Sequence, residues 1–262
     1  MQTQSTLFSR IHPELRLMIW KHAIGAQTLH IVSKYRRLGH AVCDEDYWEQ
    51  ARSERPDIRA SSYLFVYGSL PTTKQLADWS MCNLLVACRK LYNEAISILY
   101  QTNTFALWDL RTITAFKDGI PSRSWETIRS IDVYAMNYRE DDNAAAVEVR
   151  SELECAHWSQ SCSALLSLPN LRSLRVFMGN VSKFNEESTT YQAALSALRP
   201  LRGVGADCEV YFPEERPERR RSQWRLCRIT EEEKRRLEHQ LQQEGFRCRV
   251  HSGTQLYSEH RV

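Results

Sequence analysis

The amino-acid sequence predicts an α/β or α+β fold, and three observations support this prediction. A strand-like pattern, Ile128-Arg129-Ser130-Ile131-Asp132-Val133, returns 43 residues later as Leu171-Arg172-Ser173-Leu174-Arg175-Val176. Helix-like stretches precede this second copy and a weaker third copy at residues 201–204. Two segments upstream of the repeat carry apolar residues at helical spacing. The alternation of strands and helices favours right-handed crossovers and a parallel sheet.

The N-terminal part begins with a loose segment, residues 1–10, and continues into a predicted helix. Pro13 suits the first helical turn because its missing N–H would have no partner there. His12 is then a mediocre N-cap, and Gly25 is well placed to end the helix. The apolar stripe at helical spacing comprises Leu15, Met18, Ile19 and His22.

An inserted strand pair and a second helix follow. Residues 29–35 and 63–67 read as strands, and the charged segment 39–60 reads as a long loop with one helical turn near 47–51. The second helix is expected from about residue 80 to 100, with an apolar stripe wide enough to place it centrally. A strand at 104–108 and a short helix at 110–117, closed by Gly119, come next.

The repeat layer and the C-terminus complete the expected element order. Helices are expected at 143–167 and 186–198, and the third strand at 208–212. Residues 213–223 form a charged linker before a possible strand at 224–229. Thr230 and Glu233 form a capping box that opens a helix ended by Gly245, and a strand follows at 246–250. We expect residues 8–215 to form one compact domain and residues 216–262 a charged linker with a strand-helix-strand extension.

Composition is ordinary for a soluble globular protein. The 262 residues are 42% hydrophobic and 26% charged, with a net charge of +3 that does not by itself imply nucleic acid. No apolar run approaches the roughly 20 residues of a membrane helix, and no secretory signal is recognisable. The eight cysteines include no Cys-x-x-Cys pair, which favours reduced, buried thiols. We therefore expect a cytoplasmic or nuclear protein without a cofactor and without membrane contact.

Two motifs carry a family resemblance over about residues 8–215. The first is Ile11-His12-Pro13-Glu14-Leu15-Arg16-Leu17-Met18-Ile19-Trp20. The second comprises Leu84 to Arg89, Tyr92-Asn93-Glu94-Ala95, Leu99-Tyr100, Asn103 and Phe105. Together they resemble a large set of uncharacterised proteins from filamentous fungi, described as F-box-like or as carrying a domain of unknown function. The 43-residue repeat also resembles the strand of a leucine-rich repeat, in a short and irregular form.

The resemblance implies a non-enzymatic protein-interaction module of the kind that serves as a substrate adaptor of a ubiquitin ligase. In this interpretation the first helix places Ile11, Leu15, Ile19 and Trp20 against a groove of a Skp-type adaptor. The alternative is that these residues pack into the protein's own core, which is the default for an apolar helix stripe and is favoured. Such a protein would be a stand-alone scaffold or regulatory module without a link to ubiquitin.

Three other groups of residues are candidates for a binding or metal site. Arg219, Arg220 and Arg221 beside Trp224 could contact phosphates, but interspersed glutamates favour a solvated linker over a nucleic-acid site. Arg89, Tyr92 and Glu94 could form a polar patch, although solvated or paired side chains are favoured. Cys155, His157 and Cys162 diverge on a helix, so no metal site is expected. No nucleophile-elbow, phosphate-binding or zinc-protease motif is recognisable, and no catalytic residue is expected.

Overall fold

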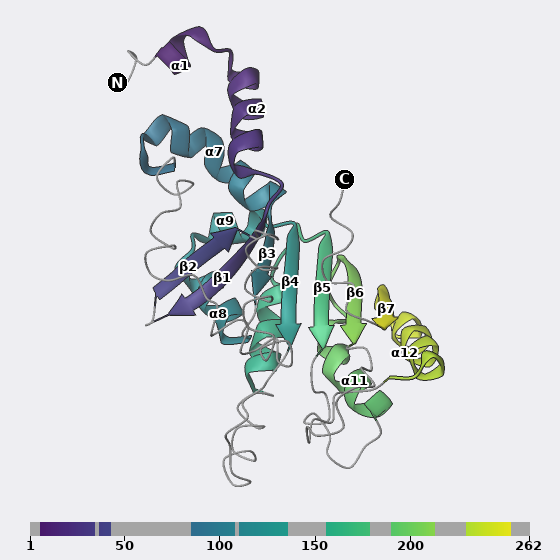
Figure 1. Ribbon diagram of the computed structural model, residues 1–262. Coiled ribbons are helices and arrows are strands. Elements are labelled where there is room, and N and C mark those ends of the chain that lie inside the picture. The colour runs from purple at the N-terminus through teal and green to yellow at the C-terminus, as the bar shows by residue number, and fades with distance from the viewer. Residues whose placement is uncertain are drawn as a thin grey trace, which may run out of the picture.

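A single mixed sheet organises the described part of the molecule (Figure 1). The computed structural model describes residues 6–34, 37–42, 85–107, 110–135, 156–178, 190–212 and 229–252. Within these residues, seven strands follow the order β2-β1-β3-β4-β5-β6-β7. The strands are β1 (Thr28–Lys34), β2 (Arg37–Val42), β3 (Thr104–Leu107), β4 (Ser130–Ala135), β5 (Ser173–Met178), β6 (Asp207–Phe212) and β7 (Cys248–Ser252). The predicted α/β class is confirmed.

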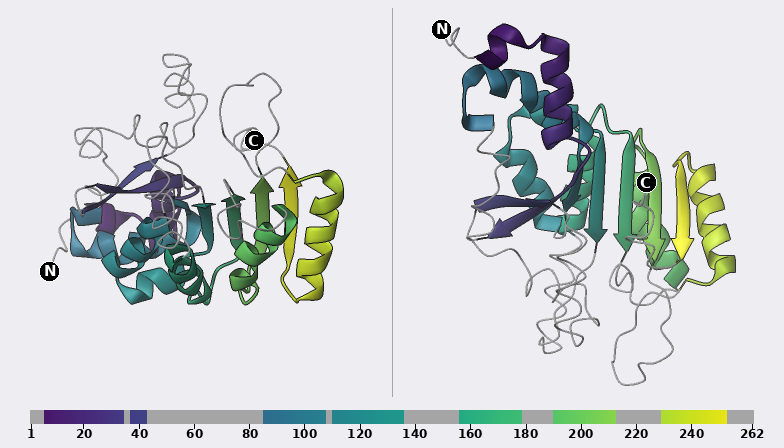
Figure 2. Two further views of the ribbon diagram at one scale, coloured as in Figure 1. Left: turned by 90° about the horizontal axis from the view of Figure 1, so that it is seen from below. Right: turned by 45° about the horizontal axis from the view of Figure 1, so that its top comes forward.

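The helices fall into an N-terminal group and a crossover group. α1 (Thr6–Arg10), α2 (Pro13–Ile24) and α7 (Arg89–Thr102) stand at the end of the sheet where the strands begin (Figures 1 and 2). The crossover group comprises α8 (Leu110–Gly119), α9 (Ser122–Thr127), a helix at residues 156–166, α11 (Thr190–Leu198) with the 3-10 turn η3 (Arg199–Leu201), and α12 (Glu231–Gln243). The crossover helices lie on one side of the sheet, and α12 lies beside the edge strand β7 (Figure 2).

Strand order follows chain order from β3 to β7, and each of these strands pairs in parallel with the next. β1 pairs in parallel with β3 and antiparallel with β2. Successive right-handed crossovers between neighbouring parallel strands place their helices on the same face, which explains the one-sided helix layer. The predicted parallel repeat layer is confirmed, whereas its likeness to a leucine-rich repeat stays a prediction.

The internal repeat sets the register of the sheet. Ser130 pairs with Ser173, Ile131 with Leu174, and Val133 with Val176, so equivalent residues of the two copies lie side by side. Their inward side chains are fully buried beneath the helix layer, as are Phe105 and Val210 on the flanking strands. A period of 43 residues therefore corresponds to one complete strand–crossover unit.

The other face of the sheet carries a row of stacked rings and a row of charges. Tyr134, Phe177, Tyr211 and His251 stack across four strands, with neighbouring ring centroids 4.5, 4.9 and 4.7 Å apart. Two residues earlier on β4 and β5, Arg175 donates to both carboxylate oxygens of the buried Asp132, with its Nε 2.7 Å from Oδ1. Cross-strand pairs of these kinds stabilise neighbouring strands in register.

Several boundaries differ from the sequence prediction. Residues 6–10 are helical rather than loose, because α1 packs its Phe8 ring against Arg16 and Lys90. Residues 39–42 belong to β2, which pairs with β1, so the loop predicted from Gly39 is wrong at its start. β7 begins two residues later than predicted, because Phe246 N donates to Leu241 O and so belongs to the end of α12.

The second predicted helix is interrupted at residues 87 and 88, so that α7 begins at Arg89, whereas its predicted start near residue 80 lies outside the described residues. Residues 85 and 86 are helical, and the Cys88 sulfur accepts a hydrogen bond from Leu91 N as the N-cap of α7. α7 is also less central than predicted, since only Leu91 and Ala95 of its residues are buried.

Other predictions lie outside the described residues. They are the strand at 63–67, the turn at 47–51, residues 143–155 and 186–189, the linker and the strand at 224–228. The domain boundary at residue 216 stays a prediction. Within the described residues, no helix combines the length and the apolar composition needed to cross a membrane.

Candidate protein-interaction site

α2 and α7 are joined by a partly buried ion pair. Arg16 Nε and Nη2 donate to the two carboxylate oxygens of Glu94 at 3.0 and 2.7 Å. The indole Nε1 of Trp20, one turn further along α2, donates to the same carboxylate at 3.2 Å. Arg16 Nη1 donates to Ile11 O at 2.6 Å, so the guanidinium is satisfied although Arg16 is 4% exposed. Glu94 therefore joins two residues of α2 that lie 78 and 74 positions away in the sequence.

The electrostatics of this clamp, formed by Arg16, Trp20 and Glu94, favour the charged state of both partners. The hydrogen bond from Arg16 is the main cause that lowers the pKa of Glu94, and the Trp20 hydrogen bond also lowers it. The hydrogen bond to Glu94 likewise raises the pKa of Arg16. Bidentate pairing fixes both distance and orientation, so the clamp sets the angle at which α2 crosses α7.

A hydrogen-bonded joint around Asn103 fixes the C-terminal ends of α2 and α7 to the sheet. Asn103, which is 1% exposed, donates from Nδ2 to Ile24 O and to Leu99 O, at 2.7 and 2.9 Å. Its Oδ1 accepts from Gln27 N at 2.7 Å. Gly25 ends α2 where a Cβ would lie 2.6 Å from Lys21 O and 2.7 Å from Thr102 Oγ1, so only glycine fits this close approach. The two helices thus enter β1 and β3 as one rigid pair.

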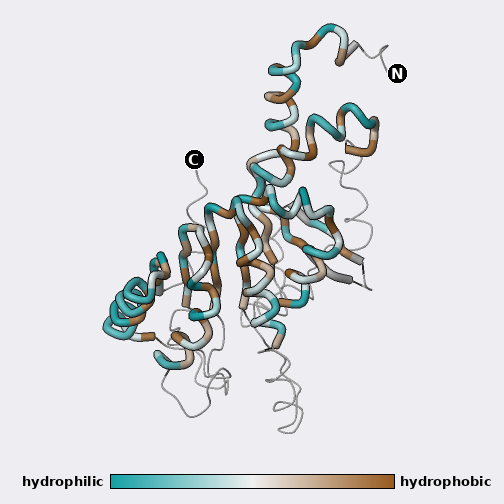
Figure 3. Tube along the Cα trace, turned by 180° about the vertical axis from the view of Figure 1, so that it is seen from behind, coloured by the Kyte–Doolittle hydropathy of each residue, from teal (hydrophilic) through white to brown (hydrophobic). Residues whose placement is uncertain are grey.

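The buried face of α2 is not the predicted one. Arg16, Trp20 and Ile24 follow each other at intervals of four and face α7 and the core. The predicted stripe lies on the opposite side, with Leu15 54%, Met18 66% and Ile19 41% exposed. Leu17, on the flank of the helix, is 42% exposed. α2 stands away from the sheet, and hydrophobic residues occur along its length (Figure 3).

The four residues predicted to contact an adaptor are divided between the two faces. Leu15 and Ile19 are exposed, and Ile11 is half-buried. Trp20 is 4% exposed and bonded to Glu94, so it supports the helix and is not presented at the surface. Met18, which the prediction did not include, is the most exposed residue of the stripe. We refer below to Leu15, Met18 and Ile19 as the α2 face.

The clamp and the joint account for residues quoted in the two sequence motifs. Arg16 and Trp20 belong to the first motif, Glu94 and Asn103 to the second, and the structure brings the two motifs together. Of the predicted polar patch, Glu94 takes part in the clamp, whereas Arg89 and Tyr92 are exposed. The presence of both motifs in one chain was the sequence signal for the contact between α2 and α7. The spacing of the motifs did not show which residue of the first motif pairs with which residue of the second.

The other candidate groups do not converge. Arg219, Arg220 and Arg221 lie outside the described residues, as does Cys155. His157 is half-buried and Cys162 is buried, and burial raises the pKa of the Cys162 thiol to about 12. Burial likewise raises the pKa of the Cys248 thiol to about 12. Within the described residues, no group of three His, Cys, Asp or Glu residues is arranged to hold a metal ion.

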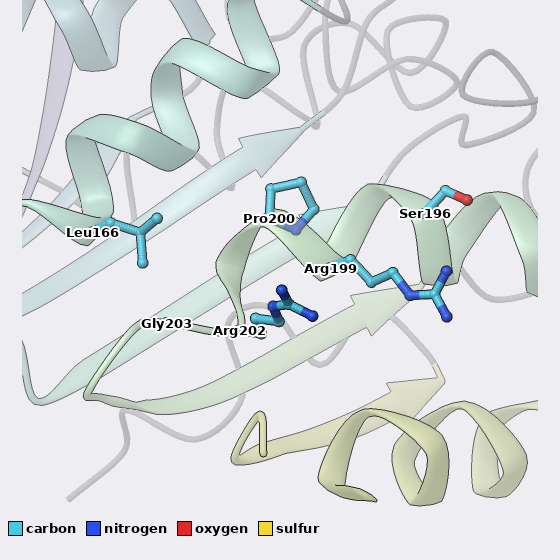
Figure 4. Close-up of a pocket in the computed structure, with 6 residues that line it drawn as sticks. All are labelled: Leu166, Ser196, Arg199, Pro200, Arg202 and Gly203. Carbon is cyan, nitrogen blue, oxygen red and sulfur yellow. The ribbon is translucent and has the colours of Figure 1, made fainter. Parts of the chain in front are cut away.

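One shallow hollow of about 540 Å³ lies in the helix layer (Figure 4). Its walls come from the helix at 156–166, from the last turn of α11 and from the segment that joins α11 to β6. The lining residues are Leu166, Ser196, Arg199, Pro200, Arg202 and Gly203. Arg199 is bound bidentately to Glu244, at 3.2 and 2.9 Å. The lining thus combines two arginines and a serine with the apolar side chains of Leu166 and Pro200.

Comparison with known proteins gives one match. A profile of the family described as "Domain of unknown function (DUF7730)" matches residues 1–234, which include the clamp, the joint and the repeat. The match ends inside α12. No curated protein matches the chain, and no solved structure matches it.

Proposed function

Since the chain belongs to the domain-of-unknown-function family DUF7730, whose description names no activity, we propose its function from the α2 face. The proposal is a non-enzymatic protein-interaction module whose α2 face docks in an apolar groove of a partner. The observation that carries it is the exposure of Leu15, Met18 and Ile19 on one side of a helix that is locked from the other side. Apolar residues at this spacing are the anchors of helix-in-groove recognition.

A Skp-type adaptor is the partner that we propose. The sequence resemblance to fungal F-box-like proteins supports this choice, because the first motif contains Leu15 and Ile19. The clamp adds support, since it presents α2 together with α7 in a fixed orientation despite the 64 residues between the end of α2 and the start of α7. A rigid pair loses little conformational freedom on binding, which favours affinity.

Three aspartates on the α2 face test this proposal. The L15D/M18D/I19D variant keeps Arg16, Trp20 and Glu94, so we expect a folded protein. Its affinity for a purified Skp-type adaptor should fall at least about thirtyfold, because charges would enter an apolar groove. The matched control is Leu166→Asp, which changes a 43% exposed leucine on the repeat layer and should leave the affinity unchanged. Equal affinities for the triple variant and the unchanged chain would refute the proposed face.

The stand-alone scaffold is the second candidate. Trp20 favours it, because this residue of the first motif is packed inside the protein's own core. Under this alternative the motif residues serve only to hold α2 on α7, and the α2 face docks a partner unrelated to ubiquitin transfer. The adaptor titration separates the two candidates, since only the first predicts binding to the adaptor.

A further inference from the structure

The repeat places arginines along one edge of the sheet. Arg129 and Arg172 immediately precede β4 and β5, and Arg247 immediately precedes β7. Arg202 lies in the turn between η3 and β6. Because parallel strands begin at the same edge, these four residues share the amino-terminal edge of the sheet. We call these four residues the arginine edge.

Most of the charge of the arginine edge is not neutralised within the described residues, although the charge of Arg202 contributes to lowering the pKa of Glu244. Arg172, Arg202 and Arg247 are exposed, and Arg129 is half-buried. Within the described residues, no hydrogen bond or ion pair involves any of the four guanidinium groups. Arg199 and Glu244, in the same region, neutralise each other. Two further carboxylates, Glu126 and Asp207, lie in the adjoining segments and are exposed. The edge therefore holds a positive surplus in a chain whose net charge is only +3.

The spacing of the arginine edge suits an extended chain. Arg129 and Arg172 lie on neighbouring strands, whose separation is about 4.8 Å, and Arg247 lies two strands further along. The edge thus spans roughly 14 Å, which about five residues of an extended peptide would cover. The shallow hollow adjoins it through Arg202 and offers the apolar walls Leu166 and Pro200.

We propose that the arginine edge and the adjoining hollow bind an acidic, extended segment of a partner protein. Carboxylates of the segment pair with the guanidinium groups, and one apolar side chain enters the hollow beside Leu166. Guanidinium groups bind carboxylates through two parallel hydrogen bonds, which suits Asp and Glu side chains. Because none of these residues belongs to the α2 face, the proposal does not depend on the ubiquitin-ligase hypothesis.

A nucleic acid fits this edge less well. Glu126 and Asp207 interrupt the positive charge of the edge, and a peptide can place an uncharged residue opposite them, whereas a nucleic acid carries a phosphate at every nucleotide. The aromatic residues of the adjoining segments, Trp125 and Phe246, are buried at 3% and 0% exposed, so they offer no ring on which a base could stack. An acidic peptide needs neither a continuous positive track nor exposed rings.

The test uses the full chain and a labelled twelve-residue peptide of repeating Glu-Glu-Leu, with binding measured by fluorescence anisotropy. The variant R129Q/R172Q/R202Q/R247Q should bind the peptide at least tenfold more weakly than the unchanged chain. The matched control R10Q/K21Q/R89Q/R235Q loses the same four charges from exposed positions elsewhere and should bind within about twofold of the unchanged chain. The double variant R172Q/R202Q removes the two central arginines and should give an intermediate loss of affinity. It tests the proposal if the quadruple variant folds poorly.

A single-stranded DNA of twelve nucleotides serves as the competing probe. The proposal predicts that the peptide binds more tightly than the DNA at the same ionic strength. Three results would overturn it. They are tighter binding of the DNA, an equal loss in the control variant, or no binding of the peptide to the unchanged chain.

Discussion

Glu94 is the residue on which the N-terminal architecture depends most. One carboxylate accepts three hydrogen bonds from Arg16 and Trp20 and thereby connects segments 74 or more residues apart. Since Arg16 is 4% exposed, removal of its partner would leave a guanidinium charge without compensation at the interface between α2 and α7. We infer that the orientation of the α2 face is set by this single carboxylate.

The first prediction concerns the pH dependence of the clamp. The pKa of Glu94 is lowered in the folded protein, so the clamp stabilises the fold above the ordinary value of 4.5. This contribution is lost as the pH falls through the lowered pKa. Glu94→Gln should therefore reduce the free energy of unfolding at pH 7, and the difference from the unchanged chain should shrink below pH 4.5. Urea unfolding across this pH range measures it.

Glu126→Gln is the control for this prediction, because Glu126 is exposed and its carboxylate has no partner within the described residues. A stability difference for Glu94→Gln that stays constant down to the acid transition would contradict the assignment.

Asn103 gives a second prediction at this scale. Its amide satisfies Gln27 N, Ile24 O and Leu99 O in the interior. Asn103→Ala would leave these backbone groups without partners, and each unsatisfied buried group costs about 1 to 3 kcal/mol. We expect a loss of about 3 kcal/mol in the free energy of unfolding by urea denaturation. Asn93→Ala, at an exposed position of the same helix, should change it by less than about 0.5 kcal/mol.

α12 shows how one element protects another. It begins with a complete capping box between Thr230 and Glu233, and its hydrophilic residues continue along most of its length (Figure 3). Glu238 accepts a hydrogen bond from Val250 N, and Gln242 donates one to Cys248 O. Both backbone groups lie on β7, the last strand of the sheet, so side chains of α12 occupy sites where another strand would pair.

The protection of β7 can be measured by hydrogen exchange. In the E238A/Q242A variant we expect the amide of Val250 to exchange at least about tenfold faster, because it loses its acceptor. We also expect concentration-dependent association through the exposed strand edge, visible by size-exclusion chromatography. Glu232→Ala, an exposed position on the same helix, should change neither quantity. Unchanged exchange at Val250 in the double variant would show that Glu238 does not protect this edge.

At the scale of the whole molecule, the repeat was the part of the fold most visible in the sequence. Residues that lie 43 positions apart in the sequence pair with each other across β4 and β5. Each copy of the repeat therefore supplies one strand, and the equivalent inward side chains of the two copies are neighbours. The capping box of α12 was equally visible, since it is a local interaction between residues three apart. Local and periodic signals therefore predicted the crossover layer well.

The orientation of α2 could not be predicted in the same way. Periodicity identified Leu15, Met18 and Ile19 as a stripe, but Trp20 and Ile24 give the opposite side an apolar anchor as well. The choice between the two sides depends on Glu94, which is far away in the sequence and pairs with Arg16. A long-range ion pair of this kind leaves no periodic pattern, so the default assumption that an apolar stripe faces the core was wrong here.

The repeat also predicts which core positions stabilise the whole molecule. Leu174 is fully buried between β4 and β6, so Leu174→Ala should lower the free energy of unfolding by about 3 kcal/mol through lost burial and a new cavity. Leu166→Ala should change it by less than about 1 kcal/mol, because Leu166 is 43% exposed. Chemical denaturation of both variants gives the comparison. Equal losses would mean that the sheet does not carry the stability of the molecule.

The central claim is that the α2 face docks in a groove of a Skp-type adaptor, and calorimetric titration of the unchanged chain with the purified adaptor tests it most directly. The account predicts one-to-one binding with a sub-micromolar dissociation constant and a negative heat-capacity change, because Leu15, Met18 and Ile19 would leave water on binding. No binding from a folded sample at high concentration would contradict it.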